Sequence, residues 1–334
     1  MKAYVLHGIN DLRYQEIEKP QCEKGWVLVK VKSAGICSSD IPRIFTKGTY
    51  HFPTIPGHEY CGVVESVGDK ADEVWIGKRV GVFPLIPCKK CQPCKNKHYE
   101  MCENYDYTGS RRDGGFAEYV AVPVWNLVEL PNEVSYKQAA LLEPLSVALH
   151  AVSCADVKKG DRVAVIGTGA IGFAAAQWAI SLGASETILV GRNAQKEQLA
   201  KKLGVVYTQN PEGLFDVVIE AVGSVSAITR SLELAKEGGR VVFMGNPEGD
   251  ITLPQSIYWR ILRKQLTIKG TWNSAYESGE LCDWSRSCDA IAKGEIKAEL
   301  LISHEFTQEE LPMALALMRD NKEPYCKVMT IWDN

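Results

Sequence analysis

Three groups of side chains in this sequence have types and spacings that can do chemistry. Cys37 and His58 lie in the segments Gly35-Ile-Cys-Ser-Ser-Asp40 and Gly57-His-Glu59. Four clustered cysteines follow, and a glycine-rich segment, Gly167-Thr-Gly-Ala-Ile-Gly172, comes last. Thiolates and imidazoles bind zinc, and a Gly-x-Gly-x-x-Gly turn binds the pyrophosphate of a dinucleotide. The three groups therefore suggest, in order, a catalytic metal, a structural metal and a nucleotide.

The four clustered cysteines are the strongest of these signals. They follow the spacing C-x2-C-x2-C-x7-C within fifteen residues, at Cys88, Cys91, Cys94 and Cys102. Such spacing is typical of a closed tetrahedral zinc site, and four free thiols in one exposed loop would oxidise readily. A zinc ribbon that binds nucleic acid is the competing interpretation, weakened by the single knuckle and by the lack of interleaved aromatic residues. We expect a structural zinc in the lobe 88–102.

Cys37 and His58 are weaker evidence by themselves. They lie far apart in sequence, so spacing alone favours a buried cysteine and a hydrogen-bonded core histidine over a pair of metal ligands.

The glycine segment stands in the setting that nucleotide binding requires. It follows a predicted buried strand at 162–166 and opens a predicted helix at 171–182. The glycines permit a tight turn, and the helix N-terminus offers N–H groups and a favourable dipole to phosphate. The expected cofactor contacts are Gly167, Gly169, Ala170, Ile171 and Gly172. A purely structural glycine turn fits this strand–turn–helix setting less well.

The end of the next predicted strand, 187–190, decides between the two dinucleotides. NAD sites usually place an acidic residue there, on the ribose 2′-hydroxyl. This chain has Gly191 and Arg192, which remove a carboxylate and add a cationic fork for a 2′-phosphate. We therefore favour NADP over NAD. The alternative is that Arg192 is a solvated surface charge and that the site does not distinguish NADP from NAD.

The elements that position these groups indicate an α/β protein with two domains. Short strands broken by Gly and Pro, such as 27–31, 62–68 and 79–82, predict a partly open antiparallel barrel in the first third. Beyond it, strands and helices alternate in the pattern of a doubly wound parallel (Rossmann) sheet. After 162–190, we expect a helix at 194–203, a strand at 216–219, a helix at 226–235, and strands at 240–244 and 266–270. The nucleotide domain is assigned to 149–282 and the other domain to 1–148 with 283–334.

Composition limits the possible partners. The 334 residues are 46% hydrophobic and 24% charged, as in ordinary globular proteins, and suffice for two cores. The net charge of -3 argues against nucleic acid as a partner. No apolar run is long enough to span a bilayer, and the N-terminus lacks the apolar core of a signal peptide. We expect a cytoplasmic protein whose eleven cysteines serve metal binding and packing rather than disulfides.

Motifs along nearly the whole chain resemble those of the zinc-containing medium-chain alcohol dehydrogenases. They are the segments around Cys37 and His58, the four-cysteine lobe, Asp113-Gly-Gly-Phe-Ala-Glu118, Glu143-Pro144 and the glycine segment. Segments 41–45, 107–116 and 261–272 are most similar to the galactitol-1-phosphate 5-dehydrogenase branch. The resemblance implies a GroES-like barrel domain that carries catalysis. It also implies hydride transfer from an alcohol to NAD(P), with one catalytic and one structural zinc per chain.

Residue roles follow from the resemblance position by position. Cys37, His58 and Glu143 match catalytic zinc ligands, and Glu59 matches a carboxylate that approaches the metal in some members. Asp40 matches the group that orients the histidine, and Ser39 the hydroxyl that passes the substrate proton outward. The further residues that the resemblance suggests are Gly223 and Thr271 for the cofactor, and Phe45, Arg111, Trp272 and Asn273 for the substrate. NAD-linked members of the branch generally carry an acidic residue at the position of Gly191.

The substrate is the least determined part. We expect a small polyol phosphate similar to galactitol 1-phosphate, with Arg111 as the phosphate contact, although Arg111 as a plain surface charge is about as well supported. Alternatives are an unphosphorylated polyol of the sorbitol type, L-threonine, or a non-catalytic NADPH-binding protein. The family also implies a homodimer or homotetramer, paired through the strand near 266–271.

Overall fold

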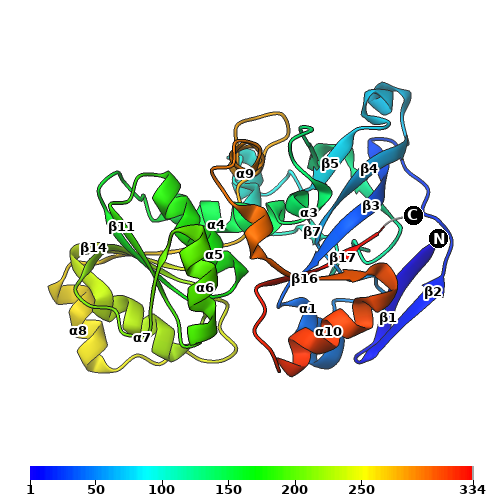
Figure 1. Cartoon of the computed structure of the whole chain (residues 1–334). Helices are drawn as coiled ribbons and strands as arrows, with labels where there is room; N and C mark the ends of the chain where they lie inside the picture. Colours follow the sequence, from blue (N-terminus) through cyan, green and yellow to red (C-terminus); the bar gives the residue numbers. More distant parts are fainter. Residues whose placement is uncertain (333–334) are drawn as a thin grey trace. The chain divides into compact units, whose positions relative to one another are not determined.

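The computed structural model describes residues 1–332 and divides the chain into two units. Unit 1 comprises 1–143, 275–293 and 302–334, and unit 2 comprises 144–274 and 294–301. Unit 1 is therefore built from both ends of the chain, the blue and red segments of Figure 1. The domain boundaries predicted at 148/149 and 282/283 stay a prediction. No helix within residues 1–332 is both long and apolar enough to cross a membrane.

A seven-stranded sheet forms the frame of unit 1. Its order is β16-β17-β3-β4-β5-β9, and β8 also pairs with β3, along Trp26–Lys30, whereas β17 pairs with Ser33–Ile36. All of its pairs are antiparallel except β16 with β17. The strands are β3 (Trp26–Ile36), β4 (Glu59–Val67), β5 (Arg79–Val82), β8 (Tyr119–Pro123), β9 (Leu127–Glu129), β16 (Ile302–Thr307) and β17 (Lys327–Ile331). The terminal strand β17 lies beside β3 (Figure 1), so the end of the chain reaches the strand that leads to Cys37.

Smaller elements surround this sheet. The hairpin β1 (Lys2–Gly8) and β2 (Asp11–Glu16) adds Tyr4 and Leu6 to the core of unit 1. The remaining pieces are β6 (Leu85–Ile86), β7 (Asp106–Tyr107), α1 (Asp40–Pro42), η1 (Arg43–Lys47), η2 (Lys70–Trp75), α2 (Gln92–Lys95), η3 (Tyr99–Met101), η4 (Val124–Asn126), α3 (Tyr136–Ala139), α9 (Asp283–Ala292), η7 (Gln308–Glu310) and α10 (Leu311–Asp320). Helix α4 (Leu142–Cys154) begins in unit 1 and continues into unit 2.

Unit 2 is a doubly wound parallel sheet. Its six strands have the order β12-β11-β10-β13-β14-β15, and every pair is parallel. The strands are β10 (Arg162–Ile166), β11 (Glu186–Val190), β12 (Val206–Thr208), β13 (Phe215–Glu220), β14 (Ala235–Phe243) and β15 (Thr267–Gly270). The accompanying helices are α5 (Ala170–Ser181), η5 (Ala194–Lys196), α6 (Glu197–Leu203), α7 (Val225–Leu234), α8 (Gln255–Arg263) and η6 (Ala298–Leu301). This is the strand order of nucleotide-binding Rossmann sheets, and the predicted fold class is confirmed.

Candidate active site

Cys37 is held at the end of β3 by a tight local turn. Its backbone N–H donates to Asp40 Oδ2 at 3.0 Å, and the Asp40 N–H donates back to the Cys37 carbonyl at 3.0 Å. Asp40 itself is completely buried. A buried carboxylate needs such partners, because burial alone strongly disfavours its charge. The turn thus places a thiol and a buried anion side by side.

His58 enters the site from the start of β4. Gly57 before it has φ +94°, and a Cβ there would lie 2.6 Å from the Phe116 ring, so this turn requires glycine. His58 Nδ1 lies 3.4 Å from Asp40 Oδ1, which leaves Nε2 for another partner. Burial alone would lower the pKa of His58, but the charges of Asp40 and Cys37 outweigh it and raise the pKa well above its usual value.

Cys37, His58 and Glu59 form one compact donor cluster. Their ligating atoms all lie within 4.8 Å of one another. His58 Nδ1 and Asp40 Oδ1 are fully buried without a well-formed hydrogen bond. Zinc in proteins is bound by thiolates, imidazoles and carboxylates. A carboxylate behind the imidazole, here Asp40, commonly orients such a histidine ligand. The residues therefore fit a zinc ion.

Glu143, the predicted third ligand, lies outside this cluster but close to it. It is buried at the start of α4, and Tyr107 Oη donates to its Oε1 at 3.2 Å. Burial raises the pKa of Glu143 to about 7, against the opposing charge of His58. The Tyr107 ring also lies against His58, with centroids 5.6 Å apart. Glu143 as a ligand stays a prediction.

Glu59 is bound by a lysine that the sequence patterns did not single out. Lys327 Nζ, on β17, lies 2.8 Å and 2.5 Å from the two Glu59 oxygens and donates to the Ile36 carbonyl at 3.3 Å. Both side chains are almost fully buried, with 5% and 1% exposure. The charge of Glu59 is therefore neutralised inside the protein. No local signal marks Lys327, because its partner is 268 residues away in sequence.

The Ser39 hydroxyl links Cys37 to Arg43, the second cation near the cluster after Lys327. Its hydroxyl donates to Cys37 Sγ at 3.2 Å and accepts from Arg43 Nη1 at 3.0 Å. Arg43 Nη1 also lies 3.6 Å from Asp40 Oδ1. All of these residues come from the turn and the helical segments α1 and η1 that follow β3.

The four-cysteine lobe is preorganised for a tetrahedral ion. The sulfurs of Cys88, Cys91, Cys94 and Cys102 all lie within 4.8 Å of one another. The separation of the Cys91 and Cys102 sulfurs is 3.9 Å, close to the ~3.8 Å that zinc–sulfur bonds of about 2.3 Å imply. Backbone N–H groups donate to sulfurs of the cluster, from Cys88 to Cys102 and from Lys90 to Cys88. These features fit a structural zinc.

The glycine segment in unit 2 has the geometry of a dinucleotide turn. Gly167 has φ +120°, and a Cβ on Gly172 would lie 2.0 Å from the Gly167 carbonyl oxygen. Gly169, the N-cap of α5, has no atom within 4 Å of its Cβ position, and no side chain caps this helix. The first N–H groups of α5 are thus left for a ligand. The strand and helix that flank the turn, β10 and α5, match the predicted elements closely.

The other predicted cofactor residues lie in the same unit. A Cβ on Gly191 would lie 2.3 Å from Thr168 Cγ2, so a larger residue there would require the Thr168 side chain to move. Arg192 is exposed, and Gly223 has φ +86° beside Asn246. The Thr271 N–H donates to the Phe243 carbonyl at 3.1 Å. Their contacts with a cofactor stay predictions.

The predicted substrate residues fall in both units. Phe45 packs on the core of unit 1, with the Arg319 guanidinium 5.0 Å above its ring. Arg111, also in unit 1, is stacked between Tyr50 and Tyr105, 4.3 Å from each ring. Trp272 and Asn273 belong to unit 2. Since the four residues divide between two units, their common substrate role stays a prediction.

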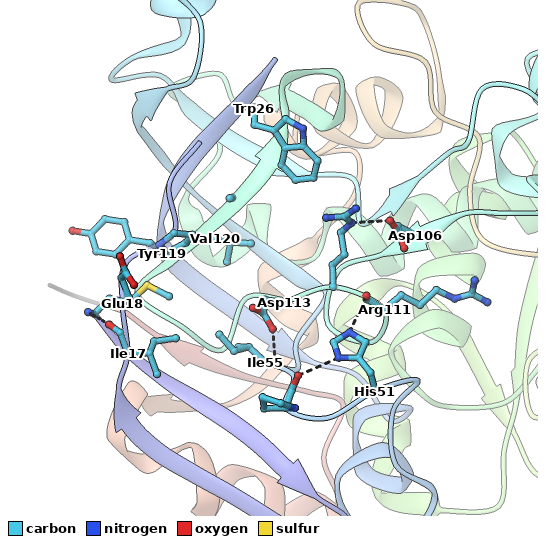
Figure 2. A pocket seen from close by; sticks show the side chains of 15 residues that line it. Ile17, Glu18, Trp26, His51, Ile55, Asp106, Arg111, Asp113, Tyr119 and Val120 are labelled. Atoms are coloured by element: carbon cyan, nitrogen blue, oxygen red, sulfur yellow. Dashed lines mark hydrogen bonds and ion pairs between the residues drawn. The ribbon is translucent and has the colours of Figure 1, made fainter. Parts of the chain in front are cut away.

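A separate cavity of about 450 Å³ opens in unit 1 (Figure 2). It is lined by residues such as Trp26, His51, Asp106, Arg112 and Asp113, and no candidate zinc ligand is among its lining residues. The Arg111 side chain extends away from the others in Figure 2 and donates from Nη1 to the Tyr105 carbonyl at 2.9 Å. This cavity is therefore distinct from the zinc cluster.

Two family models match the chain. The alcohol dehydrogenase GroES-like domain covers residues 23–132, and the zinc-binding dehydrogenase model covers residues 170–287. Galactitol 1-phosphate 5-dehydrogenase of Escherichia coli strain K12 is 32% identical over 339 residues, which are 97% of this chain and 98% of that protein. The chain belongs to the zinc-type medium-chain alcohol dehydrogenase family.

Solved structures of relatives agree with this membership. The crystal structure of E. coli galactitol-1-phosphate dehydrogenase has a TM-score of 0.92 at 31% identity, covering 99% of this chain and all of that one. A Sinorhizobium meliloti protein bound to NADP has a TM-score of 0.89 at 30% identity. An E. coli CFT073 dehydrogenase complexed with NADH has a TM-score of 0.92 at 28% identity. The similarity to each of these last two structures covers 99% of this chain and 99% of the other chain. Structures this similar thus include one with each dinucleotide.

Proposed function

We propose that this medium-chain dehydrogenase oxidises a secondary hydroxyl of a polyol phosphate, similar to galactitol 1-phosphate, to a ketose phosphate with NAD(P) as hydride acceptor. The observation that carries the proposal is the cluster of Cys37, His58 and Glu59 with Asp40 behind the imidazole. The likeness to galactitol 1-phosphate 5-dehydrogenase supports the substrate class.

In the proposed site, Cys37, His58 and Glu143 hold the catalytic zinc. When bound, zinc supplies a Lewis acid that lowers the pKa of the substrate hydroxyl. Asp40 orients His58 from behind, and Ser39 takes the hydroxyl proton and passes it outward. Tyr107 keeps Glu143 beside His58, while Lys327 holds Glu59 at the edge of the cluster. The chain's own side chains thus orient the ligands and move the proton.

The nucleotide is proposed to bind at the α5 turn, and the nicotinamide supplies the hydride acceptor. Gly169 leaves open space above the helix N-terminus, which suits a pyrophosphate. Arg192 is proposed to contact a 2′-phosphate, so that NADP is preferred. Arg192 is exposed, and its guanidinium has no ion-pair partner among the described residues. It is therefore available to bind a phosphate, which supports this role.

Arg111 is the proposed contact for the substrate phosphate. Its guanidinium is clamped between two tyrosine rings, and Tyr105 leads through Tyr107 to Glu143. A preorganised guanidinium is well suited to phosphate. The same contacts also suit a structural arginine that stabilises the 105–112 loop. An Arg111 with that role would favour a second candidate substrate, an unphosphorylated polyol of the sorbitol type or L-threonine.

The strand β15 is proposed to pair subunits of a homodimer or homotetramer. It is the last strand in the order of the unit 2 sheet, so its outer edge has no strand partner among residues 1–332. Such an edge can continue a sheet into a second copy of the chain.

The proposal is tested by a steady-state grid of NADP and NAD against galactitol 1-phosphate, other hexitol and pentitol phosphates, the free polyols and L-threonine. We expect kcat/KM for the best phosphorylated polyol to exceed that of its free polyol at least tenfold, with NADP preferred. Turnover of free polyols alone would refute the phosphate contact. A clear NAD preference would refute the role of Arg192.

A further inference from the structure

Arg43 is attached to the same short turn that carries Cys37. It lies four residues beyond Ser39, a spacing that places two side chains on one face of a helix. Its Nη1 donates to Ser39 Oγ at 3.0 Å and lies 3.6 Å from the buried Asp40 Oδ1. Arg43 begins the π-helical turn η1, and its side chain is only 27% exposed. The guanidinium is therefore held in place beside the cluster.

The chemistry of Arg43 determines how the Ser39 hydroxyl is oriented. A hydroxyl carries one proton and two lone pairs, whereas a guanidinium only donates. Ser39 Oγ must therefore accept from Arg43, and its own proton is directed to Cys37 Sγ at 3.2 Å. One lone pair of Ser39 is left for a third partner.

We propose that Arg43 is a positioning residue that acts through Ser39. It keeps the serine proton on the Cys37 sulfur, so that the remaining lone pair faces the hydroxyl of the substrate. This inference rests on the proposed function, in which Ser39 accepts the substrate proton. As the substrate O–H bond breaks, its proton forms a bond to Ser39 Oγ. The serine hydroxyl then turns its own proton away from Cys37 Sγ, and that O–H bond breaks to release the proton. Because a guanidinium cannot accept it, the released proton leaves toward the cofactor ribose or solvent.

Two other roles for Arg43 give different results. Arg43 as a phosphate anchor affects KM for phosphorylated substrates and does not need Ser39. Arg43 as a charge partner of Asp40 acts through Asp40 and His58, and it also does not need Ser39. A double-mutant cycle between Arg43 and Ser39 separates both from the proposal, since only residues that act together are non-additive.

The first measurement needs no substrate. Cobalt(II) is exchanged into the catalytic site with the lobe zinc retained, and the sulfur-to-cobalt absorption band is recorded for wild type, Arg43→Met, Ser39→Ala and the double variant. Hydrogen bonds to a ligand tune the metal that it binds. Losing the bond to Cys37 should shift the band to longer wavelength in Ser39→Ala. We expect a shift of the same direction in Arg43→Met, which removes the donor to Ser39, and no further shift in the double variant.

Controls keep this result interpretable. Arg43→Lys retains a donor and should restore most of the wild-type band. Arg319→Gln removes an arginine that stacks on Phe45 of the same helical turn and should leave the band unchanged. Metal content and thermal unfolding midpoints show that each variant is folded and loaded. An unchanged band in Arg43→Met would overturn the proposal, and so would a shift by Arg43→Met that is equally large with and without the Ser39→Ala change.

The second measurement follows turnover of galactitol 1-phosphate and galactitol. Ser39→Ala should lower kcat about 100-fold. Arg43→Met should lower kcat about tenfold, with little change in KM, and should have no effect in the Ser39→Ala background. A KM increase confined to the phosphate ester would contradict the proposal. If wild type oxidises neither compound, the proposed function fails, while the cobalt spectra still decide the role of Arg43.

Discussion

Lys327 and Glu59 form a buried ion pair, with Lys327 Nζ 2.8 Å and 2.5 Å from the two carboxylate oxygens. The pair connects β17, near the end of the chain, to β4, which begins directly after His58. Glu59 is the carboxylate of the donor cluster with Cys37 and His58, so Lys327 places a positive charge in contact with that cluster. The C-terminal strand thus contributes to the electrostatics of the candidate zinc site as well as to the sheet.

Lys327→Met should strongly destabilise unit 1, because it leaves the Glu59 carboxylate buried without its partner. Breaking one side of a buried pair costs about 3–5 kcal/mol. Lys137→Met is the matched control, since it breaks the exposed Lys137–Glu305 pair, 2.5 Å long with both side chains over 40% exposed. That loss should be about 0–1 kcal/mol. Urea unfolding of both variants measures the difference, and equal losses would contradict the prediction.

Cys91→Ser should remove the lobe zinc and leave the catalytic one. Metal analysis should fall from two zinc ions per chain to one, because a closed zinc site needs all four thiolates. The thermal unfolding midpoint should fall as well. Cys22→Ser, outside the four-cysteine cluster, should keep both ions. A Cys91→Ser protein that still holds two zinc ions would rule out the structural site.

Arg192→Ala should lower kcat/KM for NADP about tenfold or more, because a hydrogen bond from a charged donor is worth about 1.5–3 kcal/mol. The value for NAD should stay within about twofold, since NAD lacks the 2′-phosphate. Lys201→Ala, an exposed cation on α6, serves as the control. Equal losses with both cofactors would show that Arg192 does not distinguish them.

Asp216→Asn should weaken unit 2 in a pH-dependent way. Asp216 accepts from the Arg162 backbone N–H at 2.9 Å and contacts Lys236. Burial alone would raise its pKa, but Lys236 and this N–H outweigh burial and lower the pKa below its ordinary value. The carboxylate therefore stabilises the fold above about pH 4, the pKa of an unfolded aspartate, and this stability is lost as pH falls through the lowered folded pKa.

Unfolding free energies across pH test that sign. At pH 7 Asp216→Asn should be about 1 kcal/mol less stable than wild type, and the gap should close in acid. Asp250→Asn, on an exposed loop, should show no such trend. A gap that widens toward low pH would contradict the assignment.

Local patterns predicted most of the nucleotide unit, but not β12 or α8. The strand predicted at 162–166 is β10, and the helix predicted at 171–182 is α5 at Ala170–Ser181. Each depends on hydrophobic runs and glycines within a few residues. Two of the predicted elements also differ in detail. β14 starts at Ala235 with a register shift against β13, and the helix expected at 194–203 begins as the 3₁₀ turn η5, which the Asn193 side chain caps.

The candidate site was predictable only in part. Cys37 and His58 lie in motif segments, so the resemblance located them, and the fold brings them together. Lys327 and Tyr107 were not proposed because their roles depend on partners 268 and 36 residues away. A single sequence holds no signal for such pairs. In the folded chain, the pairing of β17 with β3 brings Lys327 next to Glu59.

The most direct test of zinc-dependent catalysis compares wild type with Cys37→Ala for zinc content and NAD(P)H formation from galactitol 1-phosphate in the same preparations. We predict two zinc ions and turnover for wild type. For Cys37→Ala we predict one zinc ion, no measurable turnover and an intact unit 2. A Cys37→Ala protein with two zinc ions or near wild-type kcat would contradict the assignment of Cys37 as a catalytic zinc ligand.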